Sequence, residues 1–294
     1  MHLLKALRPH QWIKNAFVFA ALVFSRNLTN ADLGVRSLLV FGAFSLVASS
    51  IYLVNDVADF ERDRVHPKKR LRPIAAGQVS RSAALATAAL LGPLGLALGY
   101  SLDPAAGVVL TTYGVMNLAY SLWLKHVVLL DVFTIALGFL FRVSAGAFAI
   151  GVAISPWLLI CTFFIALFLG FCKRRNELES LGDDAAQHRG NLADYSLQFI
   201  DKMVAALASM TVMSYALYTI DPRTVAKVGT NALVLTVPLV LFGIFRYLFL
   251  VHQRGKGGSP TELVLKDRSL QTVIGLYLLM SIACIYFNVH LELA

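Results

Sequence analysis

Long apolar stretches run through the whole chain, and this feature limits its fold more strongly than any other. A membrane-spanning helix needs about 20 mostly apolar residues, and the sequence holds about nine stretches that meet this criterion. They lie near residues 11–25, 36–56, 82–101, 105–124, 127–150, 155–173, 200–220, 231–250 and 270–290. Hydrophobic residues make up 57% of the 294 residues and charged residues only 15%. One soluble core could not bury so much apolar surface, so the sequence predicts an all-α polytopic membrane protein.

The connections between these stretches predict the orientation. Three long, charged connections, near residues 57–81, 174–199 and 251–269, follow even-numbered stretches and therefore lie on one side of the membrane. Most Lys and Arg residues fall on that side, which the positive-inside rule identifies as cytoplasmic. We therefore expect a cytoplasmic N-terminus, an external C-terminus and a site that faces the cytoplasm from the inner (plasma) membrane. The net charge of +9 is assigned to the membrane surface and to anionic substrates, with no nucleic-acid partner.

An acidic motif ends the second stretch. At about 100° per residue, Asn55 lies at 0°, Asp59 at about 40°, Asp63 at about 80° and Asp56 at about 100°, so four oxygen-bearing side chains share one helix face. Oxygen ligands without His or Cys suit Mg²⁺, which usually shares a few carboxylates with substrate phosphates. The alternative is an ordinary solvated helix end.

A basic segment follows the acidic motif directly. Among its members, Lys69 and Arg72, which precedes Pro73, are the favoured candidates for binding a diphosphate beside the metal. Taken alone, such a segment is usually only a topology signal.

These motifs resemble those of the UbiA superfamily of intramembrane prenyltransferases. The residues that carry the resemblance are Asn55-Asp56-x-x-Asp59-x-x-x-Asp63 and Arg70-x-Arg72-Pro73-Ile74. The resemblance covers essentially residues 1–294 as one transmembrane domain. It implies nine helices around a central cavity, with two acidic motifs that bind Mg²⁺ and a diphosphate.

The second motif differs from the superfamily pattern. Most members carry Asp-x-x-x-Asp after the sixth helix, whereas this chain reads Lys173-Arg174-Arg175-Asn176-Glu177. With Lys173 at 0°, Glu177 lies at about 40° and Arg174 at about 100°, so one face combines two bases with a single acid. This combination argues against two-metal binding of a prenyl diphosphate and favours a substrate with additional phosphate groups.

Further stretches resemble one branch of the superfamily, the decaprenyl-phosphate phosphoribosyltransferases. These stretches are Leu7-Arg8-Pro9-x-Gln11-Trp12-x-Lys14-Asn15, Leu124-Lys125-His126, Lys173-Arg174-x-x-Glu177-Leu178 and Leu265-Lys266-Asp267-Arg268-x-Leu270-Gln271. The branch implies transfer of 5-phosphoribose from phosphoribosyl pyrophosphate to a polyprenyl phosphate for cell-envelope glycolipid synthesis. The leaving group is pyrophosphate.

The resemblance implies the following roles. Metal ligands are Asn55, Asp59, Asp63 and Glu177, with Glu177 on a second metal or on a ribose hydroxyl. Donor phosphate ligands are Lys69, Arg72, Lys173, Arg174, Tyr120 and Lys125. Lipid phosphate ligands are Lys14 and Arg142, and Asp267 and Arg268 form a lid. The catalytic residues are Asp59 and Asp56, and Asp56 is the one candidate for a general base.

Several alternatives stay open at the level of sequence. Arg142 could pair with Asp131 or with a backbone carbonyl for structural reasons, Tyr120 and Lys125 could be interfacial anchors, and Asp267 with Arg268 could be a helix-end pair. Two other functions compete: transfer of a polyprenyl group from its diphosphate to an aromatic acceptor, and transport of an anionic lipid. The sequence leaves the polyprenyl length, the number of metal ions and any homo-oligomer undetermined, because lipid-facing and subunit-facing surfaces look alike.

Overall fold

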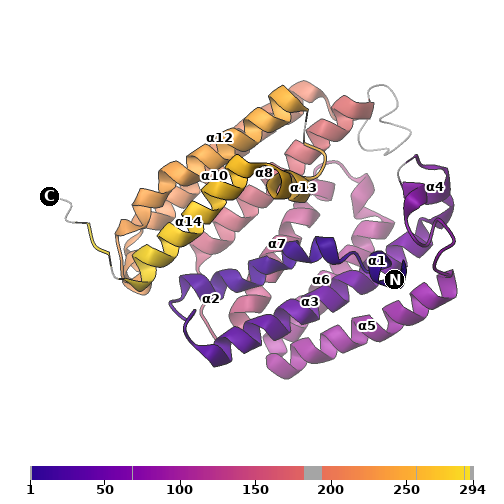
Figure 1. Cartoon of the computed structure of the whole chain (residues 1–294), viewed down its shortest axis with the longest axis horizontal. Helices are drawn as coiled ribbons and strands as arrows, with labels where there is room; N and C mark the ends of the chain where they lie inside the picture. The colour runs from indigo at the N-terminus through magenta and orange to yellow at the C-terminus, as the bar shows by residue number, and fades with distance from the viewer. Residues whose placement is uncertain (1, 68, 182–193, 256, 288, 292–294) are drawn as a thin grey trace. The chain divides into compact units, whose positions relative to one another are not determined.

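The computed structural model describes residues 2–67, 69–181, 194–255, 257–287 and 289–291, and every regular element within them is a helix (Figure 1). Eight helical segments in this part of the chain are long and apolar enough to cross a membrane. They are Ala31–Ala58 (α3), Arg81–Leu102 (α5), Pro104–Leu122 (α6), Leu130–Ala149 (α7), Pro156–Leu181 (α8), Leu197–Ile220 (α10), Ala232–Thr236 continued by Val237–Arg254 (η6 and α12) and Arg268–Tyr286 (α14). The structure thus confirms an all-α membrane protein and eight of the nine predicted stretches.

The first predicted stretch has a different local structure. Residues Pro9–Phe19 form a 3₁₀-helix (η1), and Ala20–Phe24 (α2) add little more than one α-helical turn. Polar side chains tie η1 to α3, because Asn15 donates to the Ser45 hydroxyl at 3.0 Å and the Trp12 indole donates to the Ser49 hydroxyl at 3.1 Å. The hydropathy pattern predicts the length of this segment. It does not predict the hydrogen bonds between the side chains of η1 and α3.

Short helices fill the connections. They are His2–Ala6 (α1), Phe60–Val65 (α4), Lys69–Leu71 (η2), Leu124–His126 (η3), Pro222–Val228 (α11) and Pro260–Lys266 (α13). The predicted connections 57–81 and 251–269 therefore contain helical turns rather than extended loops. Of the predicted connection 174–199, residues 182–193 lie outside the described residues.

One compact unit comprises residues up to Leu22, Thr29–Leu122 and Phe141–Ala153. Its centre is α3, which packs along α5, α6 and η1 (Figure 1). A Cβ atom at Gly95 would lie 2.8 Å from the Ala43 carbonyl oxygen, so glycine allows the close approach of α5 to α3. Arg36 donates to the carbonyls of Leu102 and Ala149 at 2.6 and 2.5 Å, which satisfies carbonyl groups at the C-terminal ends of α5 and α7.

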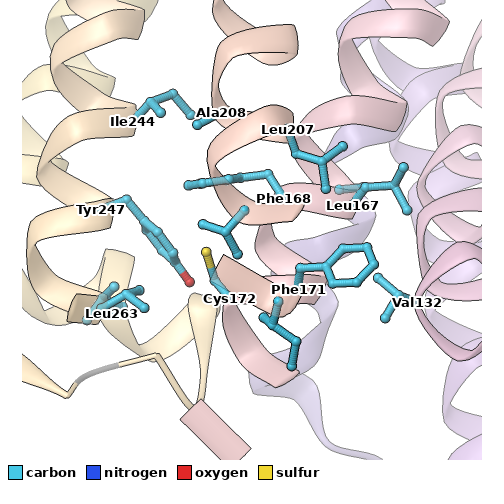
Figure 2. Close-up of a cluster of buried hydrophobic side chains, with 14 of the residues drawn as sticks. Val132, Leu167, Phe168, Phe171, Cys172, Leu207, Ala208, Ile244, Tyr247 and Leu263 are labelled. Atoms are coloured by element: carbon cyan, nitrogen blue, oxygen red, sulfur yellow. The ribbon is translucent and has the colours of Figure 1, made fainter. Parts of the chain in front are cut away.

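The second compact unit comprises Val23–Leu28, Trp123–Leu140 and the chain from Ile154 onward. Figure 2 shows its buried core, in which side chains of α8, α10 and α12 interdigitate. The Phe168 and Tyr247 rings meet edge to face with centroids 5.5 Å apart. A Cβ at Gly170 would lie 2.6 Å from Val132 Cγ1, so this glycine brings α8 close to α7.

Candidate active site

The acidic motif lies at the C-terminal end of α3, a helix that is longer than a membrane span requires. The 28 residues of α3 correspond to about 42 Å at 1.5 Å per residue, against about 30 Å for the hydrocarbon core. The helix ends at Ala58, but the Asp59 amide still donates to the Asn55 carbonyl at 2.9 Å and the Asp63 amide to the Asp59 carbonyl at 2.8 Å. Helical spacing is therefore preserved into α4, and the predicted common face survives the break.

Arg72 brings two acids of this face together. Its Nη1 atom lies 3.1 Å from Asp56 Oδ1 and 2.5 Å from Asp63 Oδ2. Both carboxylates are buried, with 2% of each side chain exposed, whereas the Arg72 side chain is 27% exposed. The predicted proximity of the acidic motif and Arg72 is thus observed in the geometry.

The segment that carries Arg72 is fixed by its own apolar residues. Ile74 is fully buried in a cluster with Leu53 of α3 and Ala84 of α5, and Val79 joins the same cluster. The Pro73 carbonyl accepts hydrogen bonds from Gln78 and Val79, which closes the turn. The residues after Arg72 therefore act as an anchor that holds its side chain over α3.

The other predicted residues of this region are less enclosed. Lys69 Nζ lies 3.9 Å from Asp63 Oδ1 and its side chain is 44% exposed, while Asn55 and Asp59 are half-buried. Asn55, Asp59 and Asp63 each carry a side-chain oxygen, which is the ligand type that Mg²⁺ prefers. Their role as metal ligands stays a prediction.

Sequence reasoning missed one cation of this cluster. Arg8, just before η1, donates to Asp56 Oδ1 at 2.5 Å and is 20% exposed. Its position inside the stretch Leu7-Arg8-Pro9 was the only signal, and that stretch supported the resemblance without suggesting a contact. Three cationic side chains, Arg8, Lys69 and Arg72, therefore contact the two buried carboxylates of Asp56 and Asp63.

The basic motif at the end of α8 has its own network. Glu177 contacts both Arg174 and Lys173, the latter at 3.7 Å, as expected for residues on one helix face. Arg174 is only 1% exposed, and its Nε donates to Asp131 Oδ2 at 2.7 Å. Lys173 is 41% exposed, so it is the accessible base of this motif.

Asp131 and Tyr195 complete the surroundings of Arg174. The Tyr195 hydroxyl donates to Asp131 Oδ1 at 3.1 Å and accepts from the Leu129 amide at 2.7 Å. Burial is the main cause that raises the pKa of Tyr195 to about 12, so this hydroxyl stays protonated at neutral pH and can donate. Asp131 therefore pairs with Arg174 within the second unit.

Arg142 lies in a buried polar cluster of the first unit. Its Nε donates to Asn15 Oδ1 at 2.8 Å and its Nη2 to the Tyr113 hydroxyl at 3.0 Å. The guanidinium also lies 4.9 Å from the Tyr113 ring centroid and 5.4 Å from that of Phe44. Lys14 is half-buried next to Asn15 in η1. The cluster supplies hydrogen bonds to an arginine that the apolar surroundings would otherwise disfavour.

The remaining predicted residues lie at helix ends. Tyr120 lies in the last turn of α6 and Lys125 in η3, both half-buried. Asp267 caps α14 by accepting from the Leu270 amide at 2.9 Å, and Arg246 donates to it at 2.8 and 3.2 Å. The hydrogen bonds from Arg246 are the main cause that lowers the pKa of Asp267. Arg268 is exposed at the first position of α14, and a role of Asp267 and Arg268 as a lid stays a prediction.

Comparisons with known proteins identify a family and relatives of this chain. The model of the UbiA prenyltransferase family matches residues 15–263. The chain is 34% identical to the decaprenyl-phosphate phosphoribosyltransferase of Mycolicibacterium smegmatis, over 97% of this chain and 93% of the relative. It is 33% identical to the protein of the same name from Corynebacterium glutamicum, over 97% of this chain and 86% of the relative.

Solved structures share the fold. A UbiA homolog from Archaeoglobus fulgidus bound to GPP and Mg²⁺ superposes with a TM-score of 0.73 at 19% identity, covering 97% of this chain and all of that one. A UbiA homolog from Aeropyrum pernix gives a TM-score of 0.62 at 16% identity, covering 91% of this chain and 97% of that one. At such low identity the likeness concerns the helical architecture alone.

Proposed function

The chain belongs to the UbiA prenyltransferase family, and from that membership we propose that it transfers 5-phosphoribose from phosphoribosyl pyrophosphate to a polyprenyl phosphate of the decaprenyl type. An oxygen of the lipid phosphate forms a bond to C1 of the ribose, and the bond from C1 to pyrophosphate breaks. The observation that carries the proposal is the 33–34% identity, over 97% of this chain, to relatives named decaprenyl-phosphate phosphoribosyltransferase.

The basic residues that contact the acidic motif of α3 support this reaction. Donor and acceptor are both anions, so a site that brings them together needs positive charge. Lys69 and Arg72 are assigned to the diphosphate of the donor, since both are partly exposed above buried carboxylates. As the lipid phosphate is already ionised, the reaction does not depend on a strong general base.

The oxygen donors of the motif are assigned to the metal. Among the described residues, no group of three His, Cys, Asp or Glu side chains could hold a metal ion. Mg²⁺ commonly takes one or two carboxylates and completes its shell with water and substrate phosphates, so Asn55, Asp59 and Asp63 fit such an incomplete set. A bound Mg²⁺ would supply positive charge to the departing diphosphate.

The second motif receives related roles. Lys173 is assigned to a donor phosphate because it is accessible, and Glu177 to a second metal or a ribose hydroxyl. Arg174 is fully buried between Asp131 and Glu177, so we assign it to holding Glu177 in place.

The polar positions of η1, α6 and α7 are assigned to the lipid side of the reaction. Lys14 and Arg142 are the candidates for the lipid phosphate, and the hydrogen bonds that Arg142 donates to Asn15 Oδ1 and to the Tyr113 hydroxyl would hold its guanidinium in place. Tyr120 and Lys125 are assigned to the donor phosphates.

We also propose that the chain crosses the membrane nine times in a defined orientation. At about 2.0 Å per residue in η1 and about 1.5 Å in α2, the segment Pro9–Phe24 reaches about 30 Å, which matches the hydrocarbon core. We place the N-terminus and the site on the cytoplasmic side of the inner membrane, and the C-terminus outside. The family match over residues 15–263 draws on both compact units, which supports one domain for the whole chain.

An assay with two substrate pairs tests the proposal. Membranes containing the protein receive labelled phosphoribosyl pyrophosphate with polyprenyl phosphate, or separately a prenyl diphosphate with 4-hydroxybenzoate. We expect lipid-linked phosphoribose in the first reaction, its loss on chelation of Mg²⁺, and its loss in Asp59→Ala at an unchanged level of folded protein. Product in the second reaction alone would identify an aromatic prenyltransferase, and movement of lipid without release of pyrophosphate would identify a transporter.

A further inference from the structure

The N-terminal segment places a guanidinium on the acidic motif of α3. Arg8 Nη2 lies 2.5 Å from Asp56 Oδ1, and the Arg8 guanidinium carbon lies 4.9 Å from the centroid of the Tyr52 ring. Tyr52 and Asp56 are one helical turn apart on α3, so both lie on the face of α3 that Arg8 contacts. A hydrogen bond at one end and an aromatic ring along one side fix the direction of the Arg8 side chain.

The backbone of Arg8 is held in a conformation that its sequence disfavours. Its φ and ψ angles are 55° and 57°, in the left-handed region, although it is not glycine and it precedes Pro9, whose neighbour normally adopts an extended conformation. Ser49 of α3 fixes the chain before and after Arg8, because its hydroxyl donates to the Leu7 carbonyl at 3.0 Å and accepts from the Trp12 indole at 3.1 Å. A strained residue persists where surrounding contacts determine its position, and such residues concentrate at functional sites.

Arg8 and Arg72 meet at one atom. Both donate to Asp56 Oδ1, and Arg72 also donates to Asp63. The carboxylates are 2% exposed and the two arginine side chains 20% and 27% exposed. The two carboxylates are therefore buried below the two guanidinium groups. The guanidinium groups remain accessible, and they lie close enough together to contact one phosphate group.

We propose that Arg8 and Arg72 form a paired-guanidinium site for a phosphate group of the sugar donor, and that Asp56 is the positioning residue that holds both. This inference rests on the proposed function for the identity of the donor. The planar donor fork of arginine matches phosphate oxygens in pairs of hydrogen bonds, which the single ammonium of lysine cannot reproduce. Asp56 Oδ1 is already committed to two cations, which makes it a positioning group rather than the general base.

Substitution of Arg8 tests the site. The variants are Arg8→Gln and Arg8→Lys, and the control is Arg81→Gln, an exposed arginine at the start of α5 whose guanidinium lies 4.8 Å from the centroid of the Phe60 ring. We expect Arg8→Gln to raise KM for phosphoribosyl pyrophosphate about tenfold or more, since it removes a charge-assisted contact, and to leave KM for the lipid within about twofold. Arg8→Lys should fall between wild type and Arg8→Gln, and Arg81→Gln should match wild type.

The role of Asp56 needs a double-mutant comparison. Asp56→Asn should raise the donor KM in the wild-type background but add little in Arg8→Gln, because the group it positions is already absent. A general base would instead lower kcat in both backgrounds and leave the donor KM unchanged, and that result would overturn the assignment of Asp56.

Binding of inorganic pyrophosphate to the purified full-length protein separates this inference from the proposed reaction. We expect pyrophosphate to raise the unfolding temperature of wild type and Arg81→Gln, and to have a much smaller effect on Arg8→Gln. This readout is independent of turnover, so it holds even if the two-substrate assay yields an aromatic prenyltransferase. Equal pyrophosphate binding by wild type and Arg8→Gln would overturn the paired site. If Arg8→Gln does not accumulate in membranes, Arg8→Lys is compared in the same way.

Discussion

Among single residues, Asp267 offers a direct test of electrostatics at a helix end. Its carboxylate accepts two hydrogen bonds from Arg246 and one from the Leu270 amide, and these lower its pKa in the folded protein. A carboxyl group with a lowered pKa contributes stability above its unfolded value of about 3.9, and this contribution is lost as the pH falls through the folded pKa.

We therefore expect wild type to unfold at a higher temperature than Asp267→Asn at pH 6, and the difference to shrink as the pH falls below about 4. Asparagine is an equally good N-cap, so the variant removes the charge while it retains an acceptor for the Leu270 amide. Unfolding temperatures of the detergent-solubilised protein between pH 3 and 6 provide the measurement. A difference that is constant across this range would contradict the assigned shift.

At the scale of elements, a glycine of α7 allows η1 to pack closely against that helix in the first unit. A Cβ atom at Gly146 would lie 2.0 Å from the Val18 carbonyl oxygen, whereas one at Gly42 of α3 would have open space. We expect Gly146→Ala to lower the stability by about 1–3 kcal/mol, because the backbone of η1 must shift. Gly42→Ala is the matched control, and it should raise stability by up to about 1 kcal/mol, as alanine restricts the unfolded chain.

Denaturant unfolding of both variants, with wild type alongside, measures this contrast. Equal effects of the two substitutions would mean that η1 does not pack on α7 as described. Activity of Gly146→Ala adds a second readout, because η1 follows Arg8 and carries Lys14, both assigned here to phosphate groups.

The helices and their face patterns were predictable from sequence, and their long-range partners were not. A 100° rotation per residue correctly placed Asp56 and Asp63 on one face, and it placed Glu177 between Lys173 and Arg174. Hydropathy could not show that residues 9–19 adopt a 3₁₀-helix or that Arg8 reaches Asp56, 48 positions away. Such contacts depend on how segments far apart in the sequence pack against α3. A single sequence carries no signal for contacts at that sequence separation.

At the scale of the whole molecule, charge and hydropathy predict the membrane topology, which cysteine labelling can test. In a background without Cys161, Cys172 and Cys284, single cysteines replace Arg223 in α11 and Lys266 in α13. With the N-terminus in the cytoplasm, α11 follows the seventh span and lies outside, whereas α13 precedes the ninth span and lies inside.

We expect a membrane-impermeant maleimide to label Arg223→Cys in intact cells and Lys266→Cys only after the membrane is opened.

The number of membrane spans is tested by the same reagent with single cysteines at Lys5 and Asn30, which flank Pro9–Phe24. If this segment crosses the bilayer, Asn30→Cys is labelled from outside and Lys5→Cys is not. Labelling of both from the same side would leave eight spans, with η1 and α2 returning to the side from which the chain entered, and would place both termini on that side.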